Sequence, residues 1–186
     1  MSDRVLLSPF LFGVYVDDIA KLQNNRIGTF IILYANDVLL LARSVTTLQK
    51  LLSACEQEFE SIDMAINIKK SSCLHIGAIR DKLCSSIHTL NGREFDWVNE
   101  VCYLGVHIVH FHKFTCSVDQ AKWSFYRAAN TIFAKVGRLA SEEVMVQLLK
   151  QKCLPILLYA LDVCNLNKRT MQSLDFTINR FFYEII

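Results

Sequence analysis

The stretch Phe30-Ile-Ile-Leu-Tyr-Ala-Asn-Asp-Val-Leu-Leu-Leu-Ala42 decides how the rest of the chain is interpreted. Two short apolar runs flank the polar pair Asn36-Asp37, and apolar runs separated by turn residues are typical of strands joined in a hairpin. We therefore expect a β-hairpin over residues 26–42. Both of its arms should be buried, and the carboxylate of Asp37 should stand at its tip.

Composition places the chain among globular proteins with a substantial core. It has 186 residues, of which 52% are hydrophobic, enough for one domain or one and a half. The net charge of +2 does not require a nucleic-acid partner and does not exclude a local basic face. The 7 cysteines have no framework spacing, and no secretory segment opens the chain. We expect reduced, mostly buried thiols and an intracellular location, with nucleus and cytoplasm not separable.

The first 115 residues alternate helix and strand signals. Ser8-Pro9 is a typical helix start, so a helix is expected over 10–22, and the apolar stripe of 44–62 predicts another. Short strands are expected at 65–68, 72–77 and 101–109. Asn91-Gly92 is a strong turn signal, which should join 87–90 to 94–98.

After Cys116 the pattern becomes helical. Ser117-x-x-Gln120 resembles a capping box for a helix that runs to about Arg138. Ser141 should cap the next helix, which Pro155 kinks or restarts, and residues 170–186 should form the last. The fold class expected is α+β: an incomplete antiparallel sheet packed by helices, followed by an all-helical region.

One basic strip is expected on the 118–138 helix. At 100° per residue its apolar side chains share one broad side, and Arg127, Lys135 and Arg138 fall on the opposite side. Such a strip suits a phosphate backbone, and it is also what an ordinary solvated helix face looks like. Both interpretations stay open.

Four motifs in order resemble those of a known polymerase family. They are Leu7-Ser-Pro-Phe-Leu-Phe12, Tyr34-Ala-Asn-Asp37, Asn67-Ile-Lys-Lys-Ser71 and Tyr103-Leu-Gly105. With these residues the chain resembles the reverse transcriptase of a non-LTR (LINE-type) retrotransposon, from the middle of the palm into the thumb. The resemblance implies a partial palm over residues 1–115 and a helical, thumb-like region over 116–186.

The resemblance also implies a site. Asp37 would be a Mg²⁺ ligand on the catalytic hairpin, and Asn36 stands where the family carries a second ligand, an aspartate. Lys70 would lie near the nucleotide phosphates as a proton donor. Tyr103 and Gly105 would hold the primer end, and Arg127, Lys135 and Arg138 would contact the nucleic acid. The implied partners are an RNA template and a DNA primer.

The family's metal chemistry uses three carboxylates, one of them on a strand upstream of the first motif. We expect that no residue before Ser8 supplies this upstream carboxylate. At the hairpin, Asn36 keeps a side-chain oxygen but lacks the negative charge of an aspartate. A chain with Asp37 alone is therefore expected to be inactive by itself. Tyr15-Val-Asp-Asp18 also matches the catalytic pattern, but its helical context indicates a surface acidic pair.

The remaining metal and stacking candidates are weaker. His107, His110, His112 and Cys116 resemble zinc ligands, but their spacing fits no standard site, so separate strand and loop histidines are expected. Trp97 and Trp123 are expected to be buried or half-buried. Four cysteines lie in apolar runs and are expected in the core: Cys73, Cys102, Cys153 and Cys164.

Three interpretations of function stay open. The chain is a polymerase subunit that needs partner chains, a non-catalytic nucleic-acid-binding module, or a decayed remnant. An incomplete palm leaves an unpaired sheet edge, so self-association through that edge is expected. No run reaches the about 18 uncharged apolar residues that span a bilayer, so no membrane partner is expected.

Overall fold

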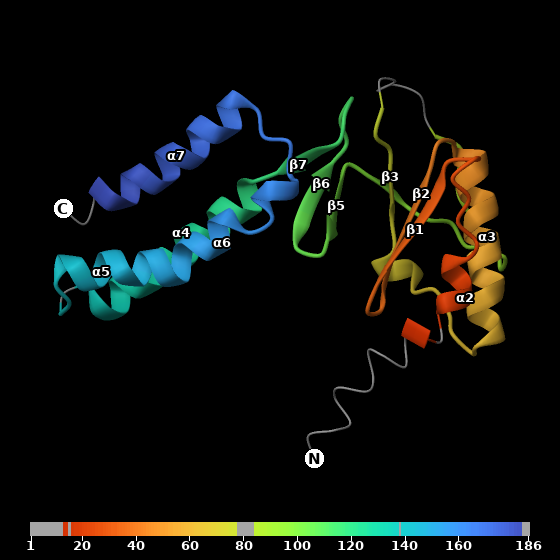
Figure 1. Ribbon diagram of the computed structural model, residues 1–186, viewed down its shortest axis with the longest axis horizontal. Coiled ribbons are helices and arrows are strands. Elements are labelled where there is room, and N and C mark those ends of the chain that lie inside the picture. The colour runs from red at the N-terminus through yellow and green to blue at the C-terminus, as the bar shows by residue number, and fades with distance from the viewer. Residues whose placement is uncertain (1–12, 15, 78–83, 138, 184–186) are drawn as a thin grey trace, which may run out of the picture. The chain divides into compact units, whose positions relative to one another are not determined.

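The computed structural model describes residues 13–14, 16–77, 84–137 and 139–183 (Figure 1). Its helices and small antiparallel sheets make the fold α+β, as predicted. The chain divides into two compact units. Unit 1 comprises Met1–Cys73 and Asp81–Trp97, and unit 2 comprises Leu74–Arg80 and Val98–Ile186. The predicted palm and thumb-like regions divide at residue 115 instead, and that division stays a prediction.

Unit 1 is built on the predicted hairpin. Strands β1 (Thr29–Tyr34) and β2 (Asp37–Ala42) pair antiparallel, with Thr29 opposite Ala42 and Tyr34 opposite Asp37. Their inner face packs with α2 (Asp17–Ala20) and α3 (Val45–Ser61), as Figure 1 shows. The core that these elements share consists of Val16, Ile19, Ile31, Leu51, Cys55 and Phe59. Of the expected 10–22 helix, the structure shows helical residues at 13–14 and the short α2, with a turn at 21–22; residues 10–12 and 15, like the start signal Ser8-Pro9, lie outside the described residues.

Helix α3 begins and ends close to prediction. The Ser44 hydroxyl accepts a hydrogen bond from the Thr47 amide at 3.2 Å, which satisfies one of the free N–H groups of the first turn. On its outer side, Gln49 and the buried Glu56 hold the segment that follows. The Gln49 Oε1 accepts the His88 N–H at 2.8 Å, and the Glu56 carboxylate accepts the Leu90 N–H at 2.7 Å.

That segment contains the predicted Asn91-Gly92 turn. The Gly92 amide donates to the Thr89 carbonyl at 3.0 Å, and Gly92 has a φ of 74°. The flanks form a single bridge, His88 with Glu94, instead of two strands. The predicted strands near 65–68 and 72–77 are also largely wrong. The structure has a 3-10 turn, η1 (Ile68–Lys70), and the two-residue strand β3 (Cys73–Leu74), which pairs with β4 (Trp97–Val98).

Unit 2 contains a three-stranded antiparallel sheet. Its strands are β5 (Glu100–Tyr103), β6 (Val106–Val109) and β7 (Thr115–Ser117), in that order. The expected single strand at 101–109 is therefore a hairpin that turns at Leu104-Gly105. Opposite residues include Cys102 with His107 and His107 with Ser117.

The helices of unit 2 follow the predicted order. They are α4 (Asp119–Val136), α5 (Glu142–Leu148), the π-helical η2 (Leu149–Cys153), α6 (Leu154–Leu158), the 3-10 turn η3 (Leu161–Val163) and α7 (Lys168–Tyr183). The π turn lies directly before Pro155, where proline removes a helical donor and crowds the preceding turn. At the start of α4, the Ser117 hydroxyl accepts the Asp119 N–H at 3.3 Å. Ser141 occupies its N-cap position without a side-chain hydrogen bond.

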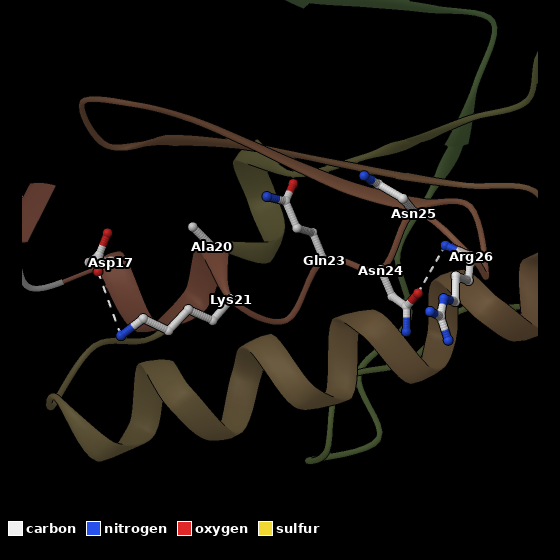
Figure 2. Close-up of a pocket in the computed structure, with 7 residues that line it drawn as sticks. All are labelled: Asp17, Ala20, Lys21, Gln23, Asn24, Asn25 and Arg26. Atoms are coloured by element: carbon white, nitrogen blue, oxygen red, sulfur yellow. Dashed lines mark hydrogen bonds and ion pairs between the residues drawn. The ribbon is translucent and has the colours of Figure 1, made fainter.

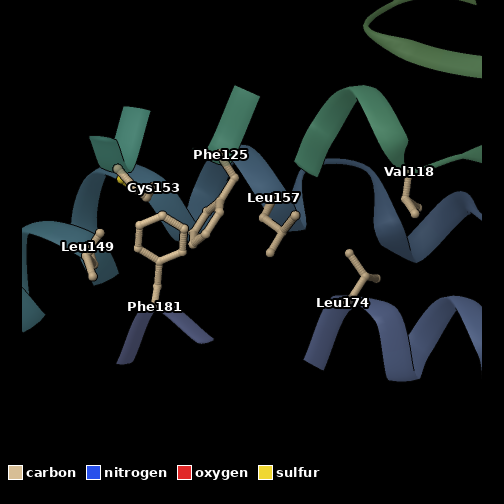
Figure 3. Packing of buried hydrophobic residues seen from close by; sticks show 8 residues of the cluster. Val118, Phe125, Leu149, Cys153, Leu157, Leu174 and Phe181 are labelled. Carbon is tan, nitrogen blue, oxygen red and sulfur yellow. The ribbon is translucent and has the colours of Figure 1, made fainter. Parts of the chain in front are cut away.

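A buried apolar cluster joins these helices (Figure 3). Phe125 of α4 and Phe181 of α7 meet edge to face, with ring centroids 5.3 Å apart. Leu149, Cys153 and Leu157 come from the kinked segment and are almost fully buried. Burying a large apolar side chain contributes about 1.5–3 kcal/mol, so this cluster is the main source of stability in unit 2.

Within the described residues, the stretch Glu142–Val163 is long and apolar enough to cross a membrane by length and composition. A core helix passes the same test, and Met145, Leu149 and Leu157 of this stretch are buried in the unit. It also carries Lys150 and Lys152. This is weak evidence for a membrane span, and the absence of a membrane partner stays a prediction.

Candidate nucleotidyl-transfer site

The hairpin tip is a two-residue turn made by Ala35 and Asn36. Tyr34 and Asp37 are the last residues paired, so Asp37 begins β2 and Asn36 stands at the turn itself. Ala35 has a φ of 48°, a left-handed conformation that costs an L-residue about 1–2 kcal/mol. Glycine usually occupies this first position of a hairpin turn. The residue that carries the carboxylate, Asp37, therefore comes directly after a turn that is mildly strained at Ala35.

Asp37 lies on the open face of the hairpin. Because side chains alternate along a strand, Asp37 shares a face with its partner Tyr34 and with Ile32. All three are exposed, Tyr34 to 61%. The prediction that both arms are buried is wrong, because only the face that meets α2 and α3 is covered. The open face bears four exposed apolar or aromatic side chains: Phe30, Ile32, Tyr34 and Leu41.

The tip offers one charged ligand. Asp37 supplies carboxylate oxygens, which hard cations such as Mg²⁺ prefer, and the neighbouring Asn36 can supply an uncharged amide oxygen. Among the described residues there is no group of three or more His, Cys, Asp or Glu side chains placed to hold a metal ion. Asp37 and Asn36 therefore fit a weak, water-rich site better than a closed protein cage.

Lys70 lies in unit 1 with the hairpin. It ends the η1 turn and is exposed, as is Lys69 beside it. The carbonyl of Asn67 accepts hydrogen bonds from the Lys70 amide at 3.0 Å and from the Ser71 hydroxyl at 2.9 Å. The Asn-x-x-Lys-Ser pattern thus closes a tight turn on its own backbone. This leaves the Lys70 ammonium group at the surface.

Tyr103 and Gly105 belong to the β5–β6 turn in unit 2. Leu104 and Gly105 both have positive φ, 50° and 78°, which is the geometry of a type I′ hairpin turn. The Tyr159 hydroxyl donates to the Leu104 carbonyl at 3.0 Å. A Cβ at Gly105 would lie 3.1 Å from the Tyr159 ring. Gly105 therefore has two structural reasons to be glycine, its φ and the ring that covers it.

Two of the three predicted cations on α4 can be placed. Arg127 and Lys135 are exposed, while Phe125 and Ala129 of the same helix are buried. Arg138 lies outside the described residues. Trp123 is 70% exposed, so the prediction that it is buried or half-buried is wrong. Trp97 is half-buried, and its Nε1 donates to the Ser85 carbonyl at 3.3 Å.

A hollow of about 720 Å³ in unit 1 is not lined by any predicted site residue. Figure 2 shows Asp17 beside Lys21 and the Asn24 side chain turned toward the backbone of Arg26. Asn24 Oδ1 accepts the Arg26 N–H at 3.0 Å, so this side chain shapes the loop. Lys21 pairs with Asp18 at 2.5 Å and with Asp17 at 3.6 Å, which raises its pKa. The prediction of a surface acidic pair at 17–18 is confirmed.

The four candidate zinc ligands have separate partners. His107 Nδ1 lies 2.7 Å from the Glu100 carboxylate, and His110 Nδ1 lies 2.6 Å from the His75 carbonyl. His112 contacts the ring of Phe111. Burial, and then the Cys164 thiol, raise the pKa of Cys116 to about 12. As predicted, His107 lies on a strand, His110 and His112 lie in the loop after it, and all three are at least partly exposed. Of the four expected core thiols, Cys153 is buried, Cys73 and Cys164 are half-buried, and Cys102 is exposed, contrary to prediction.

The comparison with protein families decides the ancestry. Residues 5–108 match the family described as reverse transcriptase (RNA-dependent DNA polymerase). The chain belongs to the reverse transcriptase family. The match includes the hairpin tip, Lys70 and the Tyr103–Gly105 turn, and it ends before α4. The family uses divalent metal ions and nucleic-acid substrates. No curated protein and no solved structure matches the chain.

Proposed function

We propose that this reverse transcriptase chain is of the non-LTR (LINE-type) class and that its catalytic hairpin is degenerate. The observation that carries the proposal is Asn36 at the turn beside Asp37. The order of the four motifs supports the class, and the family match supports the ancestry. In this proposal residues 1–115 act as palm and residues 116–186 as a thumb-like region.

The chemistry explains why one residue matters. Two divalent ions activate the primer hydroxyl and stabilise the leaving oxygen in such polymerases. Asp37 would hold Mg²⁺ with carboxylate charge, whereas Asn36 would add only an amide dipole. Lys70, exposed on η1, would offer a proton or charge to the nucleotide phosphates, and Tyr103 and Gly105 would position the primer end. The missing charge weakens metal binding where two ions must be held together.

Primer extension tests this proposal. The purified chain, a DNA primer on an RNA template, deoxynucleotides and Mg²⁺ should give no extension above background. Mg²⁺-dependent extension that Asp37→Ala abolishes would contradict the proposal. Lys113→Ala is a matched control, because Lys113 is exposed and belongs to no predicted site.

Metal binding gives a second readout that does not depend on turnover. Mn²⁺ binding, followed by water proton relaxation, should be weak in the natural chain. It should strengthen roughly tenfold in Asn36→Asp, because one more charge near a divalent ion contributes about 1–2 kcal/mol in a wet site. Asp37→Asn should weaken it. Equal Mn²⁺ binding by all three chains would show that the hairpin tip is not a metal site.

A second function is favoured by the outer face of α4. We propose that the chain binds nucleic acid even without catalysis, through Arg127, Lys135 and Arg138. The exposed Arg127 and Lys135 stand on a helix whose other side is anchored in the core, so their positions are fixed. Binding to an RNA–DNA duplex should weaken as salt rises, because phosphate contacts release counterions.

Two double variants distinguish binding through the outer face of α4 from a general effect of positive charge. Arg127→Ala with Lys135→Ala should lower affinity and reduce the slope of log affinity against log salt by about 1–2. Arg93→Ala with Lys113→Ala removes the same charge from exposed residues that do not belong to α4 and should leave the slope unchanged. Salt-independent binding, or equal effects in both pairs, would contradict the proposal.

We also propose self-association through the β1–β2 hairpin, inside the cell in either nucleus or cytoplasm. Within the described residues these strands form a two-stranded sheet, joined otherwise only by a single bridge of Thr29 with Asn24, and the open face carries Phe30, Ile32 and Leu41. Unpaired strand edges beside apolar side chains favour pairing between chains. Sedimentation velocity over a concentration series should show a growing larger species, which Ile32→Lys should reduce. A concentration-independent monomer would contradict self-association.

A further inference from the structure

An indole ring stands exposed on the outer side of α4. Trp123 is 70% exposed, and the structure gives its ring no hydrogen bond or ring contact with any described residue. Trp97, the other tryptophan of the chain, is half-buried and donates to the Ser85 carbonyl. A single exposed apolar side chain is normal on a protein surface. The neighbours of Trp123 on the helix therefore decide whether its ring can take part in binding.

The exposed side chains that follow Trp123 on α4 include two cations. Arg127 lies one turn later, at the i+4 position that places two side chains next to each other on a helix. Asn130 and Lys135 are exposed further along. Neither Arg127 nor Lys135 forms an ion pair with a described residue, so both charges are available to a ligand.

The inner side of α4 holds this surface in place. Phe125 meets Phe181 of α7 edge to face, with ring centroids 5.3 Å apart. The Lys122 ammonium group donates to the Ser173 hydroxyl at 2.7 Å and to Asp119, the acidic residue of the first turn, at 3.2 Å. The helix is thus fixed against α7, its carboxylate is paired, and the outer side keeps a net positive charge.

We propose that the outer side of α4 binds single-stranded nucleic acid, with one unpaired base stacked on the Trp123 ring and neighbouring phosphates on Arg127 and Lys135. This inference rests on the proposed binding of nucleic acid through α4, and it names the form of nucleic acid that this surface takes. Aromatic rings that stack on bases, combined with cations that follow the backbone, are a common way in which proteins hold single strands.

The spacing along the helix suits an extended strand. At about 1.5 Å per residue, Trp123 and Arg127 are about 6 Å apart along the helix axis, and Arg127 and Lys135 are about 12 Å apart. Around the axis Trp123 and Lys135 differ by about 120°, with Arg127 between them. The ring and the two charges therefore form a curved row along which a strand can lie.

The ring of Trp123 is what distinguishes a single strand from a duplex. In a duplex each base is paired and stacked between its neighbours, so its face is covered. The bases of a single strand can unstack and turn toward an aromatic ring. Arg127 and Lys135 should contact the phosphates of either form, whereas Trp123 should contribute to the binding of single strands alone.

Tryptophan fluorescence of the full chain tests the site without a substitution. Oligothymidylate and oligouridylate of about 12 nucleotides should both quench the emission, because a stacked base lies against the exposed ring. An abasic strand of the same length carries the same phosphates and should bind more weakly and without quenching. A higher affinity for one of the two base-bearing strands identifies DNA or RNA as the preferred ligand. Equal quenching by the abasic strand, or binding without any quenching, overturns the proposal.

Substitutions at Trp123 assign the quenching to this ring. Trp123→Ala should lower the affinity for the single strand roughly tenfold and the affinity for an RNA–DNA duplex by less than about twofold. Trp123→Phe keeps an aromatic face, so its affinity should stay within about threefold of the natural chain while the quenching is lost. Tyr183→Ala is the matched control, because Tyr183 is an 82% exposed aromatic residue on α7. Equal losses in Trp123→Ala and Tyr183→Ala, or equal losses for single strand and duplex, overturn the proposal.

The two cations distinguish a failure of stacking from a failure of the binding on which it rests. If Arg127→Ala with Lys135→Ala weakens the binding of single strands and Trp123→Ala does not, α4 binds nucleic acid through charge and the stacking is overturned. If the natural chain binds no strand and no duplex, both proposals are overturned. Circular dichroism checks that each variant folds, and Trp123→Ala should fold because the ring lies outside the core.

Discussion

The two hairpins of this molecule both have two-residue turns, but the turns differ in conformation and are secured differently. In β5–β6 the turn ends in glycine, and Tyr159 covers it and donates a hydrogen bond to the Leu104 carbonyl. In β1–β2 the left-handed position is Ala35, and the described residues place no side-chain hydrogen bond on the turn. The first turn is thus held by its surroundings, whereas the second stays open beside Asp37.

The contrast shows which of the two turns is explained by its structural contacts alone. The Leu104–Gly105 turn has a structural explanation within unit 2, whatever it does for a primer. The tip at Ala35-Asn36 has none, and strained, exposed turns are often kept where a site needs them. Substitutions at the two turns should therefore differ in their effect on stability.

The largest effect is expected at Gly105. Gly105→Ala should destabilise unit 2 by about 2–3 kcal/mol, because alanine is strained at a φ of 78° and its Cβ presses on the Tyr159 ring. Gly92→Ala is the matched control, since Gly92 has a φ of 74° and open space around it. Its cost in urea unfolding should be only about 1 kcal/mol. Equal costs would show that Tyr159 does not constrain the turn.

Tyr159→Phe should have the next largest effect. It removes the donor to the Leu104 carbonyl but keeps the ring, and an exposed hydrogen bond contributes about 0.5–1.5 kcal/mol. The free energy of unfolding of unit 2 should fall by that amount. In a double-mutant cycle, Tyr159→Ala should reduce the cost of Gly105→Ala. Additive costs would contradict direct contact between the two residues.

The sequence was informative where the local signals were strong. Apolar periodicity and Ser44 located α3, the two apolar runs located β1 and β2, and Pro155 marked the kink before α6. It was wrong where local backbone and side-chain hydrogen bonds favour a turn over a strand. Residues 65–68 look like a strand, yet hydrogen bonds to the Asn67 carbonyl make a turn directly after them.

The candidate site was likewise predicted in part from the sequence. Motif order was sufficient for the family and for the position of Asp37 at the tip. Sequence gave no sign that one hairpin face would stay exposed or that Tyr159 would cover Gly105, because both depend on residues distant along the chain.

At the open turn a substitution should stabilise. Ala35→Gly removes the left-handed strain of about 1–2 kcal/mol but adds chain entropy to the unfolded state, so a net gain of about 0.5–1 kcal/mol is expected for unit 1. Urea unfolding measures this gain. A loss of stability would show that the alanine methyl group makes a packing contact at the tip.

The smallest effect is expected at Asn36. Asn36→Asp should change the stability of unit 1 by less than about 0.5 kcal/mol, as is usual for exposed positions. Any cost would come from repulsion between adjacent carboxylates and should disappear at high salt, because exposed charges are screened. Urea unfolding at low and high salt tests this. A larger cost that persists in salt would mean that the fold itself requires the amide. The expected result means the opposite: an aspartate would fit this turn equally well, so the hairpin itself does not require the asparagine.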